Sequence, residues 1–187
     1  MSGPDLSDAL TAAPALLGWE LIHDSPDGRT GGIIVETEAY TAEDAASHSF
    51  RGRGVRNDVM FGPAGHIYVY FTYGMHYCIN IVTGGEGRGE AVLIRALEPT
   101  QGLELMRSRR LRARGDISLT NGPAKLTQAL AINKTHNGVF LLNKGSLRLV
   151  PGSKPERIIQ TTRIGISRAV ETPWRFYIAN NPFVSKP

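Results

Sequence analysis

The sequence lacks the features that mark exported, membrane-spanning or cysteine-cluster proteins. Cys78 is the only cysteine among 187 residues, so the chain can form neither an internal disulfide nor a cysteine cluster for zinc. No apolar run reaches the length of about 18 residues that a transmembrane helix needs, and no secretory segment is evident. Repeats, low-complexity tracts and domain-splitting linkers are also missing. We therefore expect an intracellular protein that does not bind membranes.

What the sequence does contain suits one ordinary domain. Hydrophobic residues make up 41% of the chain, which is enough for a core and argues against disorder. We predict a loose N-terminal segment over residues 1–10 and a single domain over residues 11–187. The net charge is +4, which is compatible with polyanion binding but modest, so the distribution of the charge has to decide.

The most informative stretch is residues 31–40, GGIIVETEAY. Side chains alternate between the two faces of a strand, so Glu36, Glu38 and Tyr40 should share one face. A carboxylate on a strand rich in Ile and Val is costly unless it is paired, hydrated or used. An edge strand with a solvated acidic face is the simpler alternative. The preceding residues 19–23 and the turn cluster 24–28 predict that this stretch is the second arm of a hairpin.

Residues 41–57 are typical of an irregular loop. Arg51, Arg53 and Arg56 lie among glycines, a composition that suits phosphate contact, although a solvated loop without a partner is also compatible. The acidic strand and this loop together offer a possible metal site. Its ligands would be Glu36, Glu38, Asp44 and His48. The spacing matches no known ligand pattern, so we expect no metal and no cofactor.

Residues 65–82 (GHIYVYFTYGMHYCINIV) predict a second, aromatic hairpin. Tyr68 and Tyr70 share one face of its first strand, where core packing or cross-strand pairing is the usual role. Tyr73 differs because it stands beside Gly74 at the predicted tip. A large ring held at a tip can act as a wedge between stacked bases.

The remaining residues predict short strands and a few helices. Arg95 interrupts an apolar strand at 90–97 and needs an anionic partner. Pro99 should end that strand, and a helix should run from residue 100 or 101 to Ala113, ending in a cluster of arginines. Asn121 should cap a further helix. Other short strands are predicted at 139–142, 147–150 and 175–179, and Thr11–Leu17 as a first helix. This pattern favours an α+β fold in which a mainly antiparallel, curved sheet is flanked by a few helices.

Several segments in register resemble the alkyladenine (3-methyladenine) DNA glycosylase family over most of the chain. They are Val35–Tyr40 (VETEAY), Tyr68–Asn80, Leu93–Pro99 (LIRALEP) and Gly122–Lys134. The resemblance implies a single-domain, monofunctional, metal-free enzyme that removes damaged purines from double-stranded DNA and begins base excision repair. Repair at one site requires only a monomer, which is the state that we expect. A short chain of this kind is typical of a bacterium.

The resemblance also implies roles for individual residues. Glu38 would be the general base that activates water, with Arg95 as the cation beside it and beside the target phosphate. Tyr40, His48 and Tyr70 would sandwich the extruded base, Leu93 would line the same pocket, and Asn80 would crowd the 2-amino group of guanine. Tyr73 would enter the duplex. The implied backbone contacts are Arg95, Lys134, Gly165 and, from the arginine loop, Arg56. His76, beside the wedge, has no implied role.

The residues leave two alternatives to this glycosylase. One is a non-catalytic module that binds distorted DNA with the same aromatic pocket and does not need Glu38. The other is a metal-dependent hydrolase built on the acidic strand. Hypoxanthine, ethenoadenine and N-alkylated purines are all compatible substrates.

Overall fold

The computed structural model describes residues 3–72 and 74–186, and β2 (Gly28–Tyr40) is its central strand. β5 (Glu90–Gln101) pairs along one edge of β2. The other edge is shared, because β1 (Glu20–Ser25) pairs with the first half of β2 and β8 (Arg175–Ile178) with the second half. Glu36 and Glu38 are therefore enclosed between strands on both sides, and the predicted solvated acidic edge is wrong.

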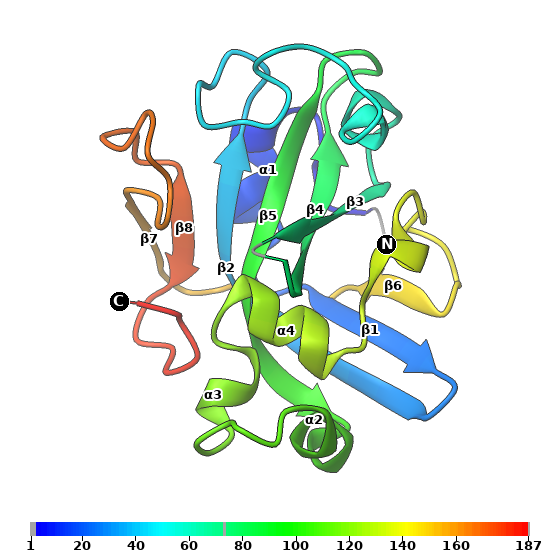
Figure 1. Ribbon diagram of the computed structural model, residues 1–187. Helices are drawn as coiled ribbons and strands as arrows, with labels where there is room; N and C mark the ends of the chain where they lie inside the picture. The colour runs from blue at the N-terminus through cyan, green and yellow to red at the C-terminus, as the bar shows by residue number, and fades with distance from the viewer. Residues whose placement is uncertain (1–2, 73, 187) are drawn as a thin grey trace.

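Eight antiparallel strands form one curled sheet (Figure 1). Beyond β5 lie β4 (His76–Thr83) and β3 (Ile67–Thr72), and beyond β1 lies β6 (Leu147–Val150). β7 (Ile158–Thr161) pairs with β8 at the far side. The sheet order is β3-β4-β5-β2-β1-β6, so both hairpins predicted from the sequence are confirmed.

The ladder between β2 and β5 is irregular where the acidic residues lie. Ile34 pairs with Leu97, Glu36 with Ala96 and Thr37 with Ile94, so the register shifts twice within four residues. Arg95 consequently has no partner residue opposite it on β2. Such β-bulges re-aim side chains and often lie next to functional sites.

Four short helices flank the sheet in the described part of the chain. They are α1 (Ala9–Ala15), α2 (Leu103–Arg109), α3 (Ile117–Thr120) and α4 (Pro123–Ala129), with 3-10 turns at Asp58–Phe61 and Lys134–His136. α1 lies behind the sheet and α4 in front of it (Figure 1). Their small and apolar faces join the core, in which Ala12, Leu16, Ile79, Ile94 and Leu126 are fully buried. The α+β prediction is confirmed.

The N-terminal residues that the structure describes are tied to the domain. Asp8 caps α1 by accepting hydrogen bonds from the backbone of Leu10 and Thr11, so the helix predicted at Thr11–Leu17 begins earlier, at Ala9. Leu6 is buried, and its carbonyl accepts a hydrogen bond from Gly84 N. Part of the segment predicted to be loose thus packs on the core.

The region after β5 differs from the prediction in two ways. Pro99 does not end the strand, because it pairs with Gly32 beyond the last residue that β4 reaches, where a missing N–H costs nothing. The helix starts only after Gly102, whose φ is +74° and at which a Cβ would lie 2.2 Å from the Arg29 carbonyl oxygen. Arg110 leaves the helical conformation, so the helix ends at Arg109 rather than at Ala113.

Two smaller predictions also fail. Gly122, not Asn121, is the N-cap of α4, and the Asn121 side chain instead accepts a hydrogen bond from Lys125 Nζ at 2.7 Å. Residues 139–142 form only a single bridge, between Phe140 and His66, in place of a strand. None of the helices in the described part of the chain is long and apolar enough to cross a membrane.

Candidate active site

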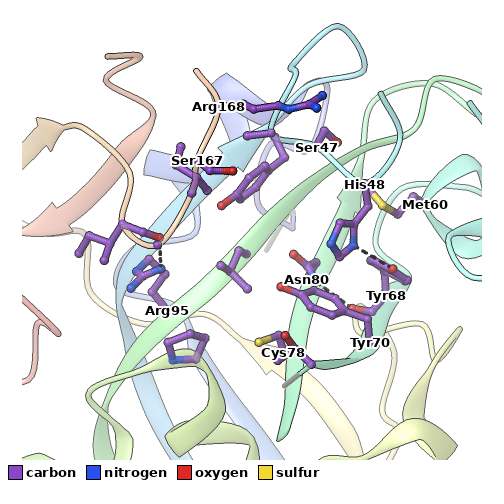
Figure 2. Close-up of a pocket in the computed structure, with 18 of the residues that line it drawn as sticks. Ser47, His48, Met60, Tyr68, Tyr70, Cys78, Asn80, Arg95, Ser167 and Arg168 are labelled. Carbon is purple, nitrogen blue, oxygen red and sulfur yellow. Dashed lines mark hydrogen bonds between the residues drawn. The ribbon is translucent and has the colours of Figure 1, made fainter. Parts of the chain in front are cut away.

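A cavity of about 440 Å³ opens over strands β3, β4 and β5, on one face of the sheet. Figure 2 shows its two sides: Ser167 and Arg168, from the segment after β7, lie across from His48, Tyr68 and Tyr70. Side chains from the loop after β2 and from α4 complete the wall. Of the predicted site residues, the wall contains Tyr40, His48, Arg56, Tyr70, Asn80, Leu93, Arg95 and Gly165.

Three rings form the aromatic side of the cavity. The His48 and Tyr70 rings are 4.5 Å apart at 71°, and the Tyr68 and Tyr70 rings are 5.5 Å apart at 30°. A hydrogen bond of 3.1 Å joins His48 Nδ1 to the Tyr68 hydroxyl. Tyr68 is buried as expected for a core residue, while His48 is exposed at the mouth. The arrangement leaves aromatic surface open toward the cavity.

Glu38 lies directly behind the wall rather than in it. Its side chain is fully buried. One carboxylate oxygen accepts from Ile164 N at 2.7 Å and lies 3.2 Å from Arg95 Nη1, and the other accepts from the Tyr40 hydroxyl at 2.8 Å. Each of these three partners also lines the cavity. The carboxylate is thus fixed one layer below the cavity surface, with both oxygens satisfied by residues of the wall.

Arg95 links this carboxylate to a second one. Its Nε donates to Glu36 at 3.1 Å, and Glu36 also accepts from Arg175 Nη1 at 2.8 Å and from Ser185 N and Oγ at 2.7 and 2.9 Å. Burial alone would lower the pKa of Arg95, but Glu38 and Glu36 raise it, so the guanidinium stays charged. The predicted anionic partner of Arg95 is confirmed as a pair of carboxylates.

A second buried ion pair supports Tyr40 from outside the cavity. Arg163 pairs with Asp44 and donates to the Ala39 carbonyl oxygen at 3.0 Å. Its guanidinium carbon lies 4.7 Å from the centre of the Tyr40 ring and 5.2 Å from that of Trp174. Because Arg163 is not part of the cavity wall, it covers the outer side of the Tyr40 ring and leaves the inner side free.

Asn80 and Leu93 lie opposite each other on β4 and β5 and form part of the cavity wall. Asn80 is buried, and its Nδ2 donates to the Tyr68 carbonyl oxygen at 3.1 Å. This bond fixes the orientation of the amide. A ligand that reaches this point therefore meets a rigid polar group beside an apolar one.

The cavity favours rings in their neutral forms. Loss of solvent around the ring and the nearby Arg56 charge lower the pKa of His48. Burial, followed by the charge of Glu38, raises the pKa of Tyr40, and burial likewise raises the pKa of Tyr70. At neutral pH, His48 is therefore uncharged and both tyrosines keep their protons.

The residues predicted to contact the DNA backbone are placed less uniformly. Gly165 is exposed at the cavity mouth with φ +76°, so its backbone is open to solvent. Arg56 donates to the Phe71 carbonyl oxygen at 3.2 Å and lies 5.8 Å from the centre of the Tyr70 ring. Lys134 is exposed outside the cavity and donates to the Val69 carbonyl oxygen at 3.2 Å. The predicted wedge, Tyr73, lies outside the described residues.

The alternative metal site is not assembled. Asp44 is engaged by Arg163, and Glu36 by two arginines and Ser185. Across residues 3–72 and 74–186, no three His, Cys, Asp or Glu side chains are grouped so that they could hold a metal ion.

Sequence reasoning missed Arg163, Arg175 and the support that Glu36 gives to Arg95. Arg163 lies in residues 162–167 (TRIGIS), where Gly165 was the only residue assigned a role from the sequence. A buried arginine two residues before that glycine has no local signature, since its partner Asp44 is 119 residues away. The Ile and Val residues around Glu36 indicated that the strand is buried. Two buried carboxylates need more than one cation, so a second arginine beside Arg95 could have been predicted.

The fold and the site together define a class: an α+β protein with a cavity of about 440 Å³, aromatic on one side, over a buried, arginine-bound carboxylate. The methylpurine-DNA glycosylase (MPG) family model matches residues 5–182. The chain belongs to this family of DNA repair glycosylases, as the sequence resemblance indicated.

Individual relatives agree over nearly their full length. A "Putative 3-methyladenine DNA glycosylase" of Methanoculleus marisnigri is 51% identical over 184 residues, which cover 96% of this chain and 94% of that protein. A protein of the same name from Carboxydothermus hydrogenoformans is 50% identical, with 96% and 94% covered. Another from Streptomyces avermitilis is 47% identical, with 94% and 85% covered.

Proposed function

We propose that the protein is a monofunctional glycosylase that takes alkylated or deaminated purines out of duplex DNA and hydrolyses their N-glycosidic bond with water activated by Glu38. The observation that carries this proposal is the buried Glu38 carboxylate, fixed behind a cavity that has aromatic rings on one side. A base inside a duplex cannot reach such a cavity, so the nucleotide must first be flipped out, at a cost of a few kcal/mol.

The cavity would hold the flipped base by stacking. Tyr40, His48 and Tyr70 present ring surface from two sides, and an N-alkylated purine carries a positive charge that each ring face attracts by about 0.5–2 kcal/mol. A neutral His48 adds a hydrogen-bonding edge without repelling such a cation. Neutral lesions such as hypoxanthine and ethenoadenine would bind by stacking and by contacts to the base edge, without the cation–π attraction.

Glu38 would supply the chemistry. Breaking the bond between the sugar C1′ and the base gives the sugar oxocarbenium character, and a nearby carboxylate stabilises that charge. The same carboxylate accepts a proton from the water that attacks C1′, a contribution typically worth about 10²–10⁴-fold. Arg95, Tyr40 and the Ile164 backbone hold it in place. Water would reach it through the wall that these three groups form.

Two features of the wall support the rest of the proposal. Asn80, held by Tyr68, would clash with the 2-amino group of an undamaged guanine. No lysine is among the described residues that line the cavity, which favours attack by water over a covalent lysine intermediate with strand cleavage. DNA contacts would come from Arg56, Arg95, Lys134 and the Gly165 backbone, and from Tyr73 as the wedge. A single site of this kind requires only a monomer.

The test is release of free base from duplexes that each contain one lesion: 3-methyladenine, 7-methylguanine, hypoxanthine or ethenoadenine. Wild-type protein should release at least one of them. Glu38→Gln should release none, yet bind the damaged duplex as tightly as wild type. Glu171→Gln, which removes an exposed carboxylate, is the matched control and should be fully active.

The same assay separates the alternatives. A non-catalytic binder would bind the lesions without releasing any base, and Glu38→Gln would then change nothing. A metal-dependent hydrolase would lose activity in a chelator, whereas the proposed enzyme keeps it.

A further inference from the structure

A second cavity, also of about 440 Å³, lies beside the first and is lined by positive charge. The described residues of its wall include three arginines and one histidine but no acidic residue. They are His76, Ser108, Arg109, Arg110, Leu111, Arg112, Ala113 and Gln128. They come from the start of β4, from the end of α2 and the turn after it, and from α4. In Figure 1, α4 lies just below the start of β4, and α2 lies below α4.

The two cavities adjoin at the hairpin of β3 and β4. Thr72 lines the first cavity and His76 the second, and these residues are partners across the hairpin. A molecule that places one group in the first cavity and continues past the hairpin therefore runs toward the second.

The arginines of this region divide into neutralised and uncompensated ones. Arg107 pairs with Glu104 and Asp116, and Arg109 pairs with Asp27 and donates to Ser25 and the Ala129 carbonyl. These contacts join α2 to its neighbours. The two arginines are therefore not available for an additional anion.

Arg110 and Arg112 differ, because neither has a carboxylate partner within the described chain. Arg110 donates only to neutral groups, Gln128 Oε1 at 2.7 Å and the Ser118 carbonyl oxygen at 3.2 Å, and its Nε is buried without a partner. Burial lowers the pKa of Arg110 with no anion to offset it. Arg112 is exposed at the rim. The exposed Arg112 guanidinium can therefore bind an incoming anion, and Arg110 keeps one further N–H on each terminal nitrogen beyond its bonds to Gln128 and Ser118.

We propose that Arg110, Arg112 and His76 form a phosphate site that holds a backbone phosphodiester of the duplex on the far side of the β3–β4 hairpin from the flipped base. This inference rests on the proposed function, since it is the DNA in the first cavity that brings a phosphate to the second. The site gives His76 a role and divides the arginine cluster into structural and DNA-binding members.

The experiment measures the salt dependence of binding to a duplex that contains a tetrahydrofuran abasic analogue, which needs no catalysis. Each phosphate neutralised by the protein adds about 0.9 to the slope of log Kobs against log salt. Arg110→Gln/Arg112→Gln should reduce that slope by about 0.9, the value for one phosphate, and Arg112→Gln, which removes no contact inside the fold, should reduce it by part of that amount. Lys144→Gln/Lys154→Gln removes the same charge from exposed sites outside both cavities and should change the slope much less.

Single methylphosphonate substitutions in the duplex then locate the contact. One neutral linkage should weaken wild-type binding but leave the binding of the double variant unchanged. The assignment would be overturned by a double variant whose salt slope equals that of wild type, or by a lysine control that lowers the slope as much as the arginine variant does. It would also be overturned if the double variant were as sensitive as wild type to a methylphosphonate at every linkage. If the double variant lost binding of inorganic phosphate but kept its DNA affinity, the site would serve a free anion, and the assignment would also be wrong.

The inference and the proposed function fail separately. If wild-type protein releases base but the wild-type and double-variant proteins show the same salt slope, only the phosphate site is wrong. If wild-type protein releases no base from any lesion but the double variant shows the reduced slope, the phosphate site stands and the catalytic proposal falls.

Discussion

Glu36 and Glu38 are two residues apart, fully buried and bound to the same arginine. Their other partners differ, so substitution of each should have a different effect. We predict that Glu36→Gln mainly lowers stability and that Glu38→Gln mainly abolishes base release. The two substitutions have the same size and remove the same charge, so each is the control for the other.

The magnitude follows from the partners of each carboxylate. Glu36 accepts four hydrogen bonds and is the anionic partner of Arg175, which is itself buried. Removing it leaves Arg175 without a counter-charge, and breaking a buried ion pair from one side costs about 3–5 kcal/mol. In a domain of this size, 1 kcal/mol shifts Tm by about 2–4 °C, so Glu36→Gln should lower Tm by about 6–20 °C.

Glu38→Gln should cost less stability for a structural reason. Arg95 keeps Glu36 as a partner, and the amide oxygen of the substituted side chain can still accept one of the bonds from Ile164 or Tyr40. Base release, in contrast, should fall by at least the roughly 10²–10⁴-fold that a general base supplies.

The assays are thermal and urea unfolding, set beside single-turnover base release at a temperature at which both variants are folded. Equal losses of Tm would show that the two carboxylates are not distinguished by their partners. Base release by Glu38→Gln within about tenfold of wild type would refute the role of that residue, since a general base contributes more than this. A Glu36→Gln protein as stable as wild type would contradict the ion-pair argument.

Three further predictions concern the cavity wall and the histidines. Asn80→Ser should raise release of undamaged guanine by about tenfold or more, because it removes the side chain that would meet the 2-amino group; an unchanged ratio of guanine to hypoxanthine release would contradict this steric argument. Arg56→Gln should raise the pKa of His48, because the Arg56 charge is one cause of its lowering, and the acid limb of the kcat/KM profile should move to higher pH in step with the NMR titration of His48. Burial and the charge of His23 lower the pKa of His136 below 6.5, so its neutral form is the one that the fold prefers and stability should fall as pH drops below about 6.5; urea unfolding of His136→Gln should show a shallower loss between about pH 7.5 and pH 5, and an identical pH dependence would exclude His136 as its source.

How far the sequence reveals this site depends on how local each contact is. Glu36, Glu38 and Tyr40 could be placed on one face because a strand alternates, and the 2.8 Å bond between Tyr40 and Glu38 follows from that spacing. Arg95 could be recognised because a charge in an apolar strand requires a partner. Both inferences use neighbours in the chain.

The contacts that complete the site come from far along the chain. Ile164 N reaches Glu38 across 126 residues, and Ser185 reaches Glu36 across 149. No periodicity within either segment predicts such a meeting. The bulge that places Arg95 opposite no residue of β2 is equally hidden, since it results from the register between two strands rather than from either sequence.

In the part of the chain that the structure describes, buried arginines and buried carboxylates occur in equal numbers around the cavity. This balance affects how tightly the proposed enzyme would hold a charged or a neutral base. Arg95, Arg163 and Arg175 pair with three carboxylates, those of Glu36, Glu38 and Asp44, and these carboxylates lie behind the wall. The part of the wall formed by Tyr40, His48 and Tyr70 is aromatic, and Arg56 and Arg168 also line the cavity, without a carboxylate partner among the described residues. A cationic purine stacked between these rings would be attracted by their faces, while the Arg95 guanidinium beside it is compensated by Glu36 and Glu38.

Hydrolysis converts that purine into a neutral base, so the cation–π part of its binding, about 0.5–2 kcal/mol per ring, disappears with the bond that is broken. The cavity would hold an alkylated base before cleavage more tightly than after it, and a neutral lesion such as hypoxanthine would gain no such difference. Inhibition by free product should accordingly be weaker, relative to substrate affinity, for 7-methylguanine duplexes than for hypoxanthine duplexes, and equal ratios would show that ring charge plays no part in retention.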